Sequence, residues 1–240
     1  MSWFENWFDS IYYHILYKDR DDDEARLFID NIVKKLQLKT GSNIIDVACG
    51  KGRHSNYLSS LGFNVVGIDL SENSISEAKI NEKENLKFHV HDMRKTYAKD
   101  CFDVALNLFT SFGYFSDQND NQRAIQSMAN NLKKGGYLII DFMNVKKVIA
   151  NLVMHEKKII DGIIFNIVRK IKNNYITKEI FFHDKGEDYH FEEKVEIITL
   201  ITFSELIKNT GLKIIDIFGN YQLIDFNAMT SERLILICKK

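Results

Sequence analysis

The sequence has 240 residues, enough for one domain with additions or for two small domains. Its composition is 45% hydrophobic, 12% aromatic and 27% charged, which argues against a disordered chain and predicts a sizeable core. The 32 basic and 33 acidic side chains give a formal charge of -1. The chain as a whole therefore does not favour nucleic acid or an anionic membrane as a partner.

No targeting or membrane-spanning segment is evident. Aromatic residues gather at positions 3–8, but acidic residues interrupt them and no cleavable leader pattern follows. Apolar runs such as 139–143 and 197–203 are shorter than the roughly 20 residues that a bilayer span needs. We therefore expect a cytoplasmic protein. The widely spaced cysteines predict reduced thiols rather than disulfides or a zinc site: Cys49, Cys101 and Cys238.

The first part of the chain alternates between helical and strand patterns. Apolar residues at helical spacing predict an amphipathic helix over 21–38, and another helix is predicted over 119–132. Strands that alternate with helices at this pace imply parallel crossovers, and so a doubly wound α/β sheet that is mostly parallel. The predicted strands of this part are 44–47, 65–69, 86–91, 102–108 and 137–142.

After residue 144 the rhythm changes. Three long strands are expected, and Asn173-Asn174 and Lys185-Gly186 between them are typical turn residues of an antiparallel meander. We therefore expect a three-stranded antiparallel insertion, with strands at 158–172, 175–184 and 189–201.

The α/β pattern then resumes. Thr202 and Glu205 have the spacing of a helix capping box, and the helix that they begin is expected to end at Gly211. Two final strands, at 212–218 and 233–238, complete the predicted sheet.

A loop of small residues joins the first predicted strand to the next helix. It runs Asp46-Val47-Ala48-Cys49-Gly50-Lys51-Gly52. Small residues let the backbone approach a ligand, and the helix N-terminus beside them favours negative charge. A tight turn from strand to helix also needs glycine without any ligand, so the loop by itself leaves both interpretations open.

Acidic residues at three successive strand ends favour the interpretation that the loop binds a ligand. Asp69 ends the second strand and Asp92 follows the third, while Asp46 ends the first. Carboxylates at the carboxyl edge of a parallel sheet can accept hydrogen bonds from ribose hydroxyls. Folding alone gives no reason for three such groups, because each must be solvated or hydrogen-bonded there.

A dinucleotide oxidoreductase is the first alternative. Its G-x-G-x-x-G/A fingerprint needs glycine or alanine where this chain has Ser55, so the third small position is only roughly met. The Asp92-Met93 pair after the third strand is not part of that fingerprint.

These residues resemble class I S-adenosylmethionine-dependent methyltransferases over about residues 42–144. The glycine loop of that family runs acid-x-Gly-x-Gly-x-Gly, and Asp46, Gly50 and Gly52 match it. Ala48 replaces the first glycine, for which we expect a modestly displaced backbone. The resemblance implies a seven-stranded sheet whose last two strands form an antiparallel edge hairpin.

The resemblance also implies how the cofactor, S-adenosyl-L-methionine, is bound. Asp69, with Leu70 beside it, would bind the ribose hydroxyls, and Asp92 and the Met93 N–H would bind adenine. The end of the fourth strand, Asn107-Leu108, would offer a carbonyl to the methionine amino group. Tyr12 or Arg20, in an N-terminal aromatic segment, could reach the cofactor carboxylate, although such aromatics often serve only packing.

The acceptor side is less defined. His54, Phe112 and Tyr114 are the candidate acceptor residues, and the aromatics among them could equally cover the sheet. His89 and His91 share a strand face but have no third ligand, and no metal is expected. No catalytic base is assigned, because one is required only if the acceptor arrives protonated.

Together these features predict a methyltransferase acting by in-line displacement on a small molecule, with no nucleic-acid partner. The alternatives are a regulatory or scaffold protein that binds the cofactor without turnover and, less favoured, the oxidoreductase. A homodimer could form through the insertion, which would otherwise act as a lid. The expected parts are an N-terminal helical cap (1–40), a cofactor-binding Rossmann-like core (41–144), the antiparallel insertion (145–201) and the completion of the core sheet (202–240).

Overall fold

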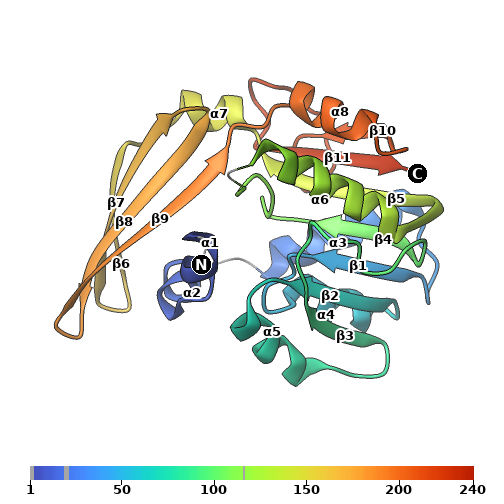
Figure 1. Ribbon diagram of the computed structural model, residues 1–240, viewed down its shortest axis with the longest axis horizontal. Coiled ribbons are helices and arrows are strands. Elements are labelled where there is room, and N and C mark those ends of the chain that lie inside the picture. Colours follow the sequence, from blue (N-terminus) through green and yellow to red (C-terminus); the bar gives the residue numbers. More distant parts are fainter. Residues whose placement is uncertain (1–2, 19–21, 116) are drawn as a thin grey trace.

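The computed structural model describes residues 3–18, 22–115 and 117–240. This part of the chain folds into a seven-stranded and a four-stranded sheet with helices between and around them (Figure 1). The helices are α1 (Trp3–Phe8), α2 (Ile11–Leu16), α3 (Asp22–Leu36), α4 (Arg53–Ser60), α5 (Glu72–Ala78), the 3-10 turn η1 (Lys79–Asn81), α6 (Gln118–Asn131), α7 (Val145–Ala150) and α8 (Leu200–Lys208). The strands are β1 (Asn43–Val47), β2 (Asn64–Asp69), β3 (Leu86–Val90), β4 (Phe102–Asn107), β5 (Leu132–Met143), β6 (His155–Ile160), β7 (Ile163–Lys172), β8 (Tyr175–Asp184), β9 (Glu187–Glu196), β10 (Lys213–Phe218) and β11 (Arg233–Lys239).

The seven-stranded sheet has the order β10-β11-β5-β4-β1-β2-β3. Strands β1 to β5 pair in parallel, whereas β11 is antiparallel to both β5 and β10. This arrangement confirms the doubly wound, mostly parallel sheet and its antiparallel edge hairpin. It also brings the ends of β1, β2, β3 and β4 to one edge, where the strand-end acids lie.

Helices cover both faces of this sheet. One buried cluster joins α6 and α8 to the sheet, with Met128 and Phe203 among its members. A second cluster joins α3, α4 and α5 to the opposite face through residues such as Phe28, Leu58 and Ile75. These two layers fix the strand ends on which the site is built. No helix in the described ranges is long and apolar enough to cross a membrane.

The four-stranded sheet lies apart from the larger one, with α1 and α2 between them (Figure 1). Its inner face packs on these helices in a third buried cluster that includes Trp7, Leu16, Phe165 and Phe182. Asp9, between α1 and α2, accepts a hydrogen bond from the Ser71 hydroxyl at 2.5 Å, which ties the same helices to the large sheet. The N-terminal segment therefore bridges the two sheets.

The insertion has four strands, so the prediction of three was wrong. Segment 158–172 is not one strand, because Asp161 and Gly162 both have a positive φ and turn β6 back onto β7. The third predicted strand also ends earlier, at Glu196.

The predicted capping box was likewise wrong. Helix α8 begins at Leu200, and the Thr199 hydroxyl caps it by accepting from the Thr202 N–H at 3.3 Å. The division of the chain at residues 40, 144 and 201 stays a prediction.

Candidate active site

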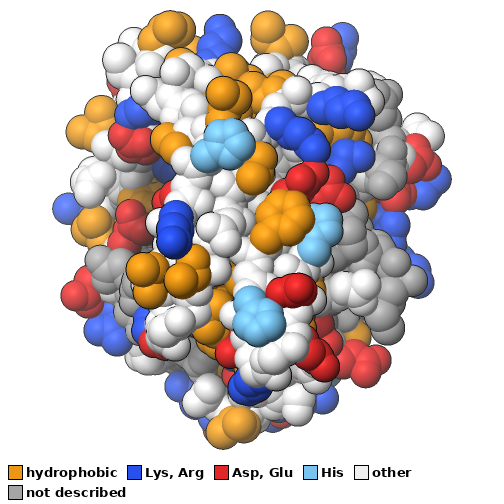
Figure 2. Space-filling model, turned by 90° about the vertical axis from the view of Figure 1, so that its left-hand side faces the viewer, with side chains coloured by type: hydrophobic (Ala, Val, Ile, Leu, Met, Phe, Trp, Pro, Cys, Tyr) orange, Lys and Arg blue, Asp and Glu red, His pale blue; other side chains and the backbone are white. Residues whose placement is uncertain are grey.

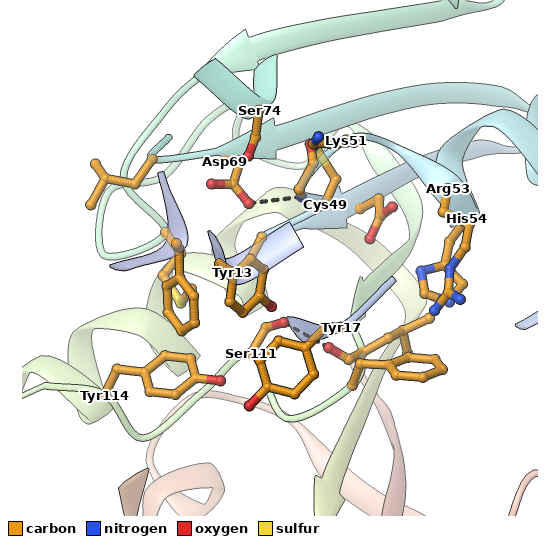
Figure 3. A pocket seen from close by; sticks show the side chains of 18 of the residues that line it. Tyr13, Tyr17, Cys49, Lys51, Arg53, His54, Asp69, Ser74, Ser111 and Tyr114 are labelled. Atoms are coloured by element: carbon orange, nitrogen blue, oxygen red, sulfur yellow. Dashed lines mark hydrogen bonds between the residues drawn. The ribbon is translucent and has the colours of Figure 1, made fainter. Parts of the chain in front are cut away.

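A cavity of about 500 Å³ lies at the carboxyl edge of the large sheet. Its floor is the loop after β1 together with the ends of β2, β3 and β4, and its other walls come from α2, the loop after β4, and β9 (Figure 3). Side chains of both sheets therefore line one cavity. Its volume is typical of a small-molecule site.

The glycine loop has the left-handed backbone that brings it close to a ligand. φ is +60° at Ala48, +55° at Gly50 and +79° at Gly52. A Cβ atom added at Gly50 would meet no atom within 4 Å, and Gly50 lines the cavity, so this position is open to a ligand. Ala48 adopts a left-handed conformation in which glycine is usual, at a cost of roughly 1–2 kcal/mol.

Gly52 has a packing role. A Cβ atom there would lie 2.4 Å from the Phe88 ring, and Gly52 is also the left-handed N-cap of α4. It does not line the cavity. The second matching glycine of the loop is therefore explained by the fold alone.

Asp46 is the most buried acid of the site, with 2% of its surface exposed. The Ser55 hydroxyl donates to its carboxylate at 2.6 Å. Burial raises the pKa of Asp46 to about 6, against the lowering effect of that hydrogen bond, and the nearby Asp69 raises it further. A cationic ligand beside Asp46 would favour the ionised carboxylate.

Asp69 holds the edge of the loop. Its two carboxylate oxygens accept from the Gly50 N–H at 2.8 Å and from the Ser71 N–H at 2.9 Å, and Figure 3 shows the first of these bonds. Burial nevertheless raises the pKa of Asp69 above its ordinary value. The carboxylate is thus fixed at the cavity wall, where it can accept further hydrogen bonds.

Asp92 is held by Arg94. The guanidinium makes a two-pronged contact with the Asp92 carboxylate, at 2.6 Å and 3.0 Å, and a further bond of 2.8 Å to Asp120 at the start of α6. Burial alone would raise the pKa of Asp92, but the bonds from Arg94 outweigh it and the pKa is lowered. Asp92 and the neighbouring Met93 both line the cavity.

The opposite side of the cavity is aromatic. Phe8 contacts Tyr13, with ring centroids 5.0 Å apart, and Tyr114, at 5.2 Å. Tyr17 lies 5.0 Å from Tyr13 and donates its hydroxyl hydrogen bond to Glu193 on β9 at 2.6 Å. These rings form a continuous wall from α2 to the loop after β4, and Figure 3 shows Tyr13, Tyr17 and Tyr114 around the cavity.

The structure brings most of the predicted site residues to this cavity. Those that line it are Asp46, Ala48, Gly50, His54, Asp69, Leu70, Asp92, Met93, Leu108 and Tyr114. Of the predicted pair at the end of β4, Leu108 lines the cavity, whereas Asn107 is fully buried and does not. The Asn107 side-chain N–H donates to the Val47 carbonyl at 3.1 Å. Arg20 lies outside the described residues.

Two expectations need correction. Tyr12 points to the second sheet, where its hydroxyl donates to Asp184 at 2.8 Å and its ring packs on Phe182. Phe112 is fully buried and packs on Phe203, so it covers the sheet rather than facing the cavity. Neither residue lines the cavity.

The sequence alone did not single out Glu193 and Val195, which reach the cavity from β9. Their alternation in a strand was visible, but nothing in it indicated which face would meet the site. Tyr13 and Tyr17 belong to the same aromatic segment as Tyr12, and helical spacing could not show which of the three would face inward. Within the described ranges, no three His, Cys, Asp or Glu side chains gather as a metal ion would need.

Known proteins share this fold and sequence pattern. Residues 38–196 match the family described as a methyltransferase domain. The chain is 22% identical to a putative methyltransferase of Geobacillus sp. (strain WCH70), over 99% of this chain and 98% of that relative. It is 28% identical to the dTDP-3-amino-3,4,6-trideoxy-alpha-D-glucopyranose N,N-dimethyltransferase of Streptomyces venezuelae, over 54% of each chain.

Among solved structures, an S-adenosylmethionine-dependent methyltransferase from Clostridium acetobutylicum ATCC 824 has the same fold, with a TM-score of 0.79. The two chains are 21% identical, and the match covers 98% of each. Since the family match spans well over half of the sequence, the oxidoreductase alternative falls away. The chain belongs to the class I S-adenosylmethionine-dependent methyltransferases.

Proposed function

We propose that this enzyme transfers the methyl group of S-adenosylmethionine to a small molecule that carries an amino group. The observation that carries the proposal is the cavity of about 500 Å³, which side chains of both sheets and of α2 line together. At about 500 Å³ it must hold both the cofactor and the reacting part of the acceptor. A cavity of this volume suits a small-molecule acceptor.

The residues of the sheet edge fit the cofactor. Gly50 leaves open space where a side chain would stand, and the fixed carboxylate of Asp69 can accept the ribose hydroxyls. Asp92 and Met93 would hold adenine, and Asp46 would lie near the positive end of the cofactor. When bound, the cofactor supplies an activated methyl group on a sulfonium.

The residues of the opposite wall would orient the acceptor. Glu193 offers a carboxylate at the cavity, and the Tyr17 hydroxyl and Trp7 indole N–H, at 2.6 Å and 2.7 Å, hold it in place. An amine N–H can donate to such oxygens while its lone pair faces the methyl group. The aromatic wall excludes water around the reacting atoms, which favours an in-line displacement.

A relative supports the amine. The Streptomyces venezuelae protein is named as an N,N-dimethyltransferase of an amino sugar nucleotide. Lys178 lies 3.4 Å from the second Glu193 oxygen, so the carboxylate is partly neutralised and suits a neutral amine rather than a strong cation. The amine must be unprotonated to react, and the enzyme needs no catalytic base if the amine binds in its unprotonated form.

The test uses methyl-tritiated S-adenosylmethionine with a bacterial extract separated into low- and high-molecular-weight fractions. We expect label in the low-molecular-weight fraction, and we expect acetylation of the amines in that fraction to abolish it. Glu193→Gln should lower transfer about tenfold while binding of S-adenosylhomocysteine stays unchanged. Label in macromolecules, or label that survives acetylation, contradicts the proposal. Cofactor binding without any transfer would instead support the scaffold alternative.

We also propose a homodimer through the outer face of the second sheet. Ile159, Ile164 and Phe181 are exposed on β6, β7 and β8, and they share that face because the strand register aligns them. Figure 2 shows hydrophobic side chains among charged ones on this side of the molecule. Light scattering should report a dimer that Ile159→Glu converts to a monomer, whereas a monomeric wild type contradicts the proposed dimer.

The cytoplasmic location stays a prediction.

A further inference from the structure

The loop that follows β4 contains two neighbouring residues in the left-handed region of backbone conformation. φ is +57° at Phe109 and +63° at Thr110. This region is unfavourable for any residue with a Cβ atom, and especially for a β-branched residue such as threonine. The surrounding contacts must therefore hold the turn in place.

Asp141 supplies those contacts from the end of β5. It is completely buried, and its carboxylate accepts from the Phe109 N–H at 2.8 Å. Its backbone carbonyl accepts from the Thr110 N–H at 2.9 Å. Both backbone N–H groups of the left-handed pair therefore donate to Asp141, so neither is left unpaired in the interior.

Arg233, at the start of β11, completes the arrangement. Its Nε donates to the Asp141 carboxylate at 2.7 Å, and its Nη2 donates to the Thr110 hydroxyl at 3.0 Å. A buried ion pair is seldom more stabilising than well-packed apolar residues, and β11 already pairs with β5 along its whole length. Strand pairing therefore gives no reason for these two charges.

The turn determines which side chains reach the cavity. Phe109 and Ser111 line it, whereas neither Asp141 nor Arg233 does. The Phe109 ring stacks on Tyr221, with centroids 5.4 Å apart, and it lies 5.1 Å from the His54 ring. The left-handed turn thus places one wall of the cavity beside the start of α4.

We propose that Asp141 and Arg233 are positioning residues for methyl transfer. They hold the left-handed turn at Phe109 and Thr110, and the turn fixes the surface that Phe109 and Ser111 present to the acceptor. The inference rests on the proposed function, because the acceptor end of the cavity is where the effect appears. Binding of the cofactor nucleoside at Asp69 should not depend on this pair.

The main test is Asp141→Asn, which keeps the shape of the side chain but removes its charge. We expect the strong intraresidue HN–Hα NOE that marks a positive φ to weaken at Phe109 and Thr110. Methyl transfer to the low-molecular-weight fraction should fall about tenfold, while the Kd for S-adenosylhomocysteine stays within about twofold. Adding Thr110→Gly should restore part of the lost rate, because glycine adopts this conformation without a Cβ penalty.

Asp103→Asn is the matched control. Asp103 is an ion-paired aspartate at the amino end of β4, on the edge of the sheet opposite to the cavity. Loss of its charge should therefore change none of these readouts. If Asp141→Asn does not fold cooperatively, Arg233→Lys replaces it, because lysine keeps the charge but cannot bind Asp141 and Thr110 with two separate nitrogens.

Wild-type NOEs and a wild-type rate in the variant, or no recovery with Thr110→Gly, would overturn the inference. The NOE requires no acceptor. A weakened NOE in an enzyme whose wild type labels no amine therefore refutes the proposed acceptor and leaves the positioning of the turn supported.

Discussion

Replacing Asp69 with asparagine tests the strand-end acids most simply. The side chain keeps its size, but a neutral amide replaces the carboxylate that now accepts from the Gly50 and Ser71 N–H groups at 2.8 Å and 2.9 Å. The amide has one acceptor oxygen and one donor group. In either orientation its NH₂ faces a backbone donor, and it can no longer hold the two ribose hydroxyls as a charged acceptor.

The expected loss follows from the hydrogen bonds. A hydrogen bond to a charged group contributes about 1.5–3 kcal/mol net, and the variant loses at least one such bond to the ribose hydroxyls. Since 1.4 kcal/mol corresponds to a factor of ten, Asp69→Asn should bind S-adenosylhomocysteine roughly 10- to 150-fold more weakly. Asp69 lies at the sheet edge, so the cooperative unfolding transition should remain.

Isothermal titration calorimetry at neutral pH measures the affinity, and thermal unfolding checks the fold. Asp103→Asn is the control, because Asp103 also accepts a backbone N–H, from Asn43 at 2.8 Å, but at the amino edge of the sheet. It should bind the ligand within about twofold of wild type, which is less than 1 kcal/mol. A folded Asp69→Asn variant that binds as wild type does would refute the assignment of Asp69 to the ribose.

Three further predictions concern stability and specificity. Asp46→Asn should unfold at higher temperature than wild type at pH 8. The raised pKa of Asp46, about 6, means that the folded state binds the proton more tightly than the unfolded state. Wild type therefore loses up to about 3 kcal/mol of folding stability as pH rises from 4 through 6. Thermal melts of the two proteins should converge near pH 4, and melting temperatures that differ equally at every pH would contradict the role of Asp46 ionisation. Gly52→Ala should lower the free energy of unfolding in urea by about 2–4 kcal/mol, because its Cβ would meet Phe88 at 2.4 Å, whereas Gly135→Ala, with a similar φ of +84° and no atom within 4 Å, should lose only about 1 kcal/mol; equal losses would contradict the clash. Tyr12→Phe should leave the Kd for S-adenosylhomocysteine within about twofold of wild type, since its hydroxyl binds the second sheet, and a large loss would restore the original assignment.

The grouping of the strand-end acids at one cavity could be predicted because its signals are local in the sequence. Asp46, Asp69 and Asp92 each follow a short apolar run, and parallel strands bring such ends to one edge of a sheet. The small residues of the loop after β1, Gly50 among them, indicated a backbone that can approach a ligand closely. No long-range contact had to be known in order to place these groups together.

The β6–β7 hairpin could have been predicted as well. Asp161-Gly162 is the dipeptide most typical of a two-residue hairpin turn, and it interrupts a run otherwise rich in isoleucine and lysine. The long apolar and basic pattern on both sides suggested a single strand instead. At the start of α8, Leu200 and Ile201 continued an apolar run, which hid the cap at Thr199.

The acceptor side could not be predicted from the sequence. The loop of residues 108–117 has no regular period, so nothing showed that Phe109 faces the cavity while Phe112 packs in the core. The bond between Asp141 and Arg233 joins positions 92 residues apart. Such contacts depend on the register of β5 and β11, which is set by the assembled sheet rather than by either segment.

A crystal structure of the complex with S-adenosylhomocysteine tests the central claim most directly. The account predicts the ribose hydroxyls within hydrogen-bond distance of the Asp69 carboxylate, and adenine beside Asp92 and Met93. It also predicts the sulfur near Asp46 and facing into the cavity. A nucleoside bound away from these strand ends, or a sulfur that faces solvent, would contradict it.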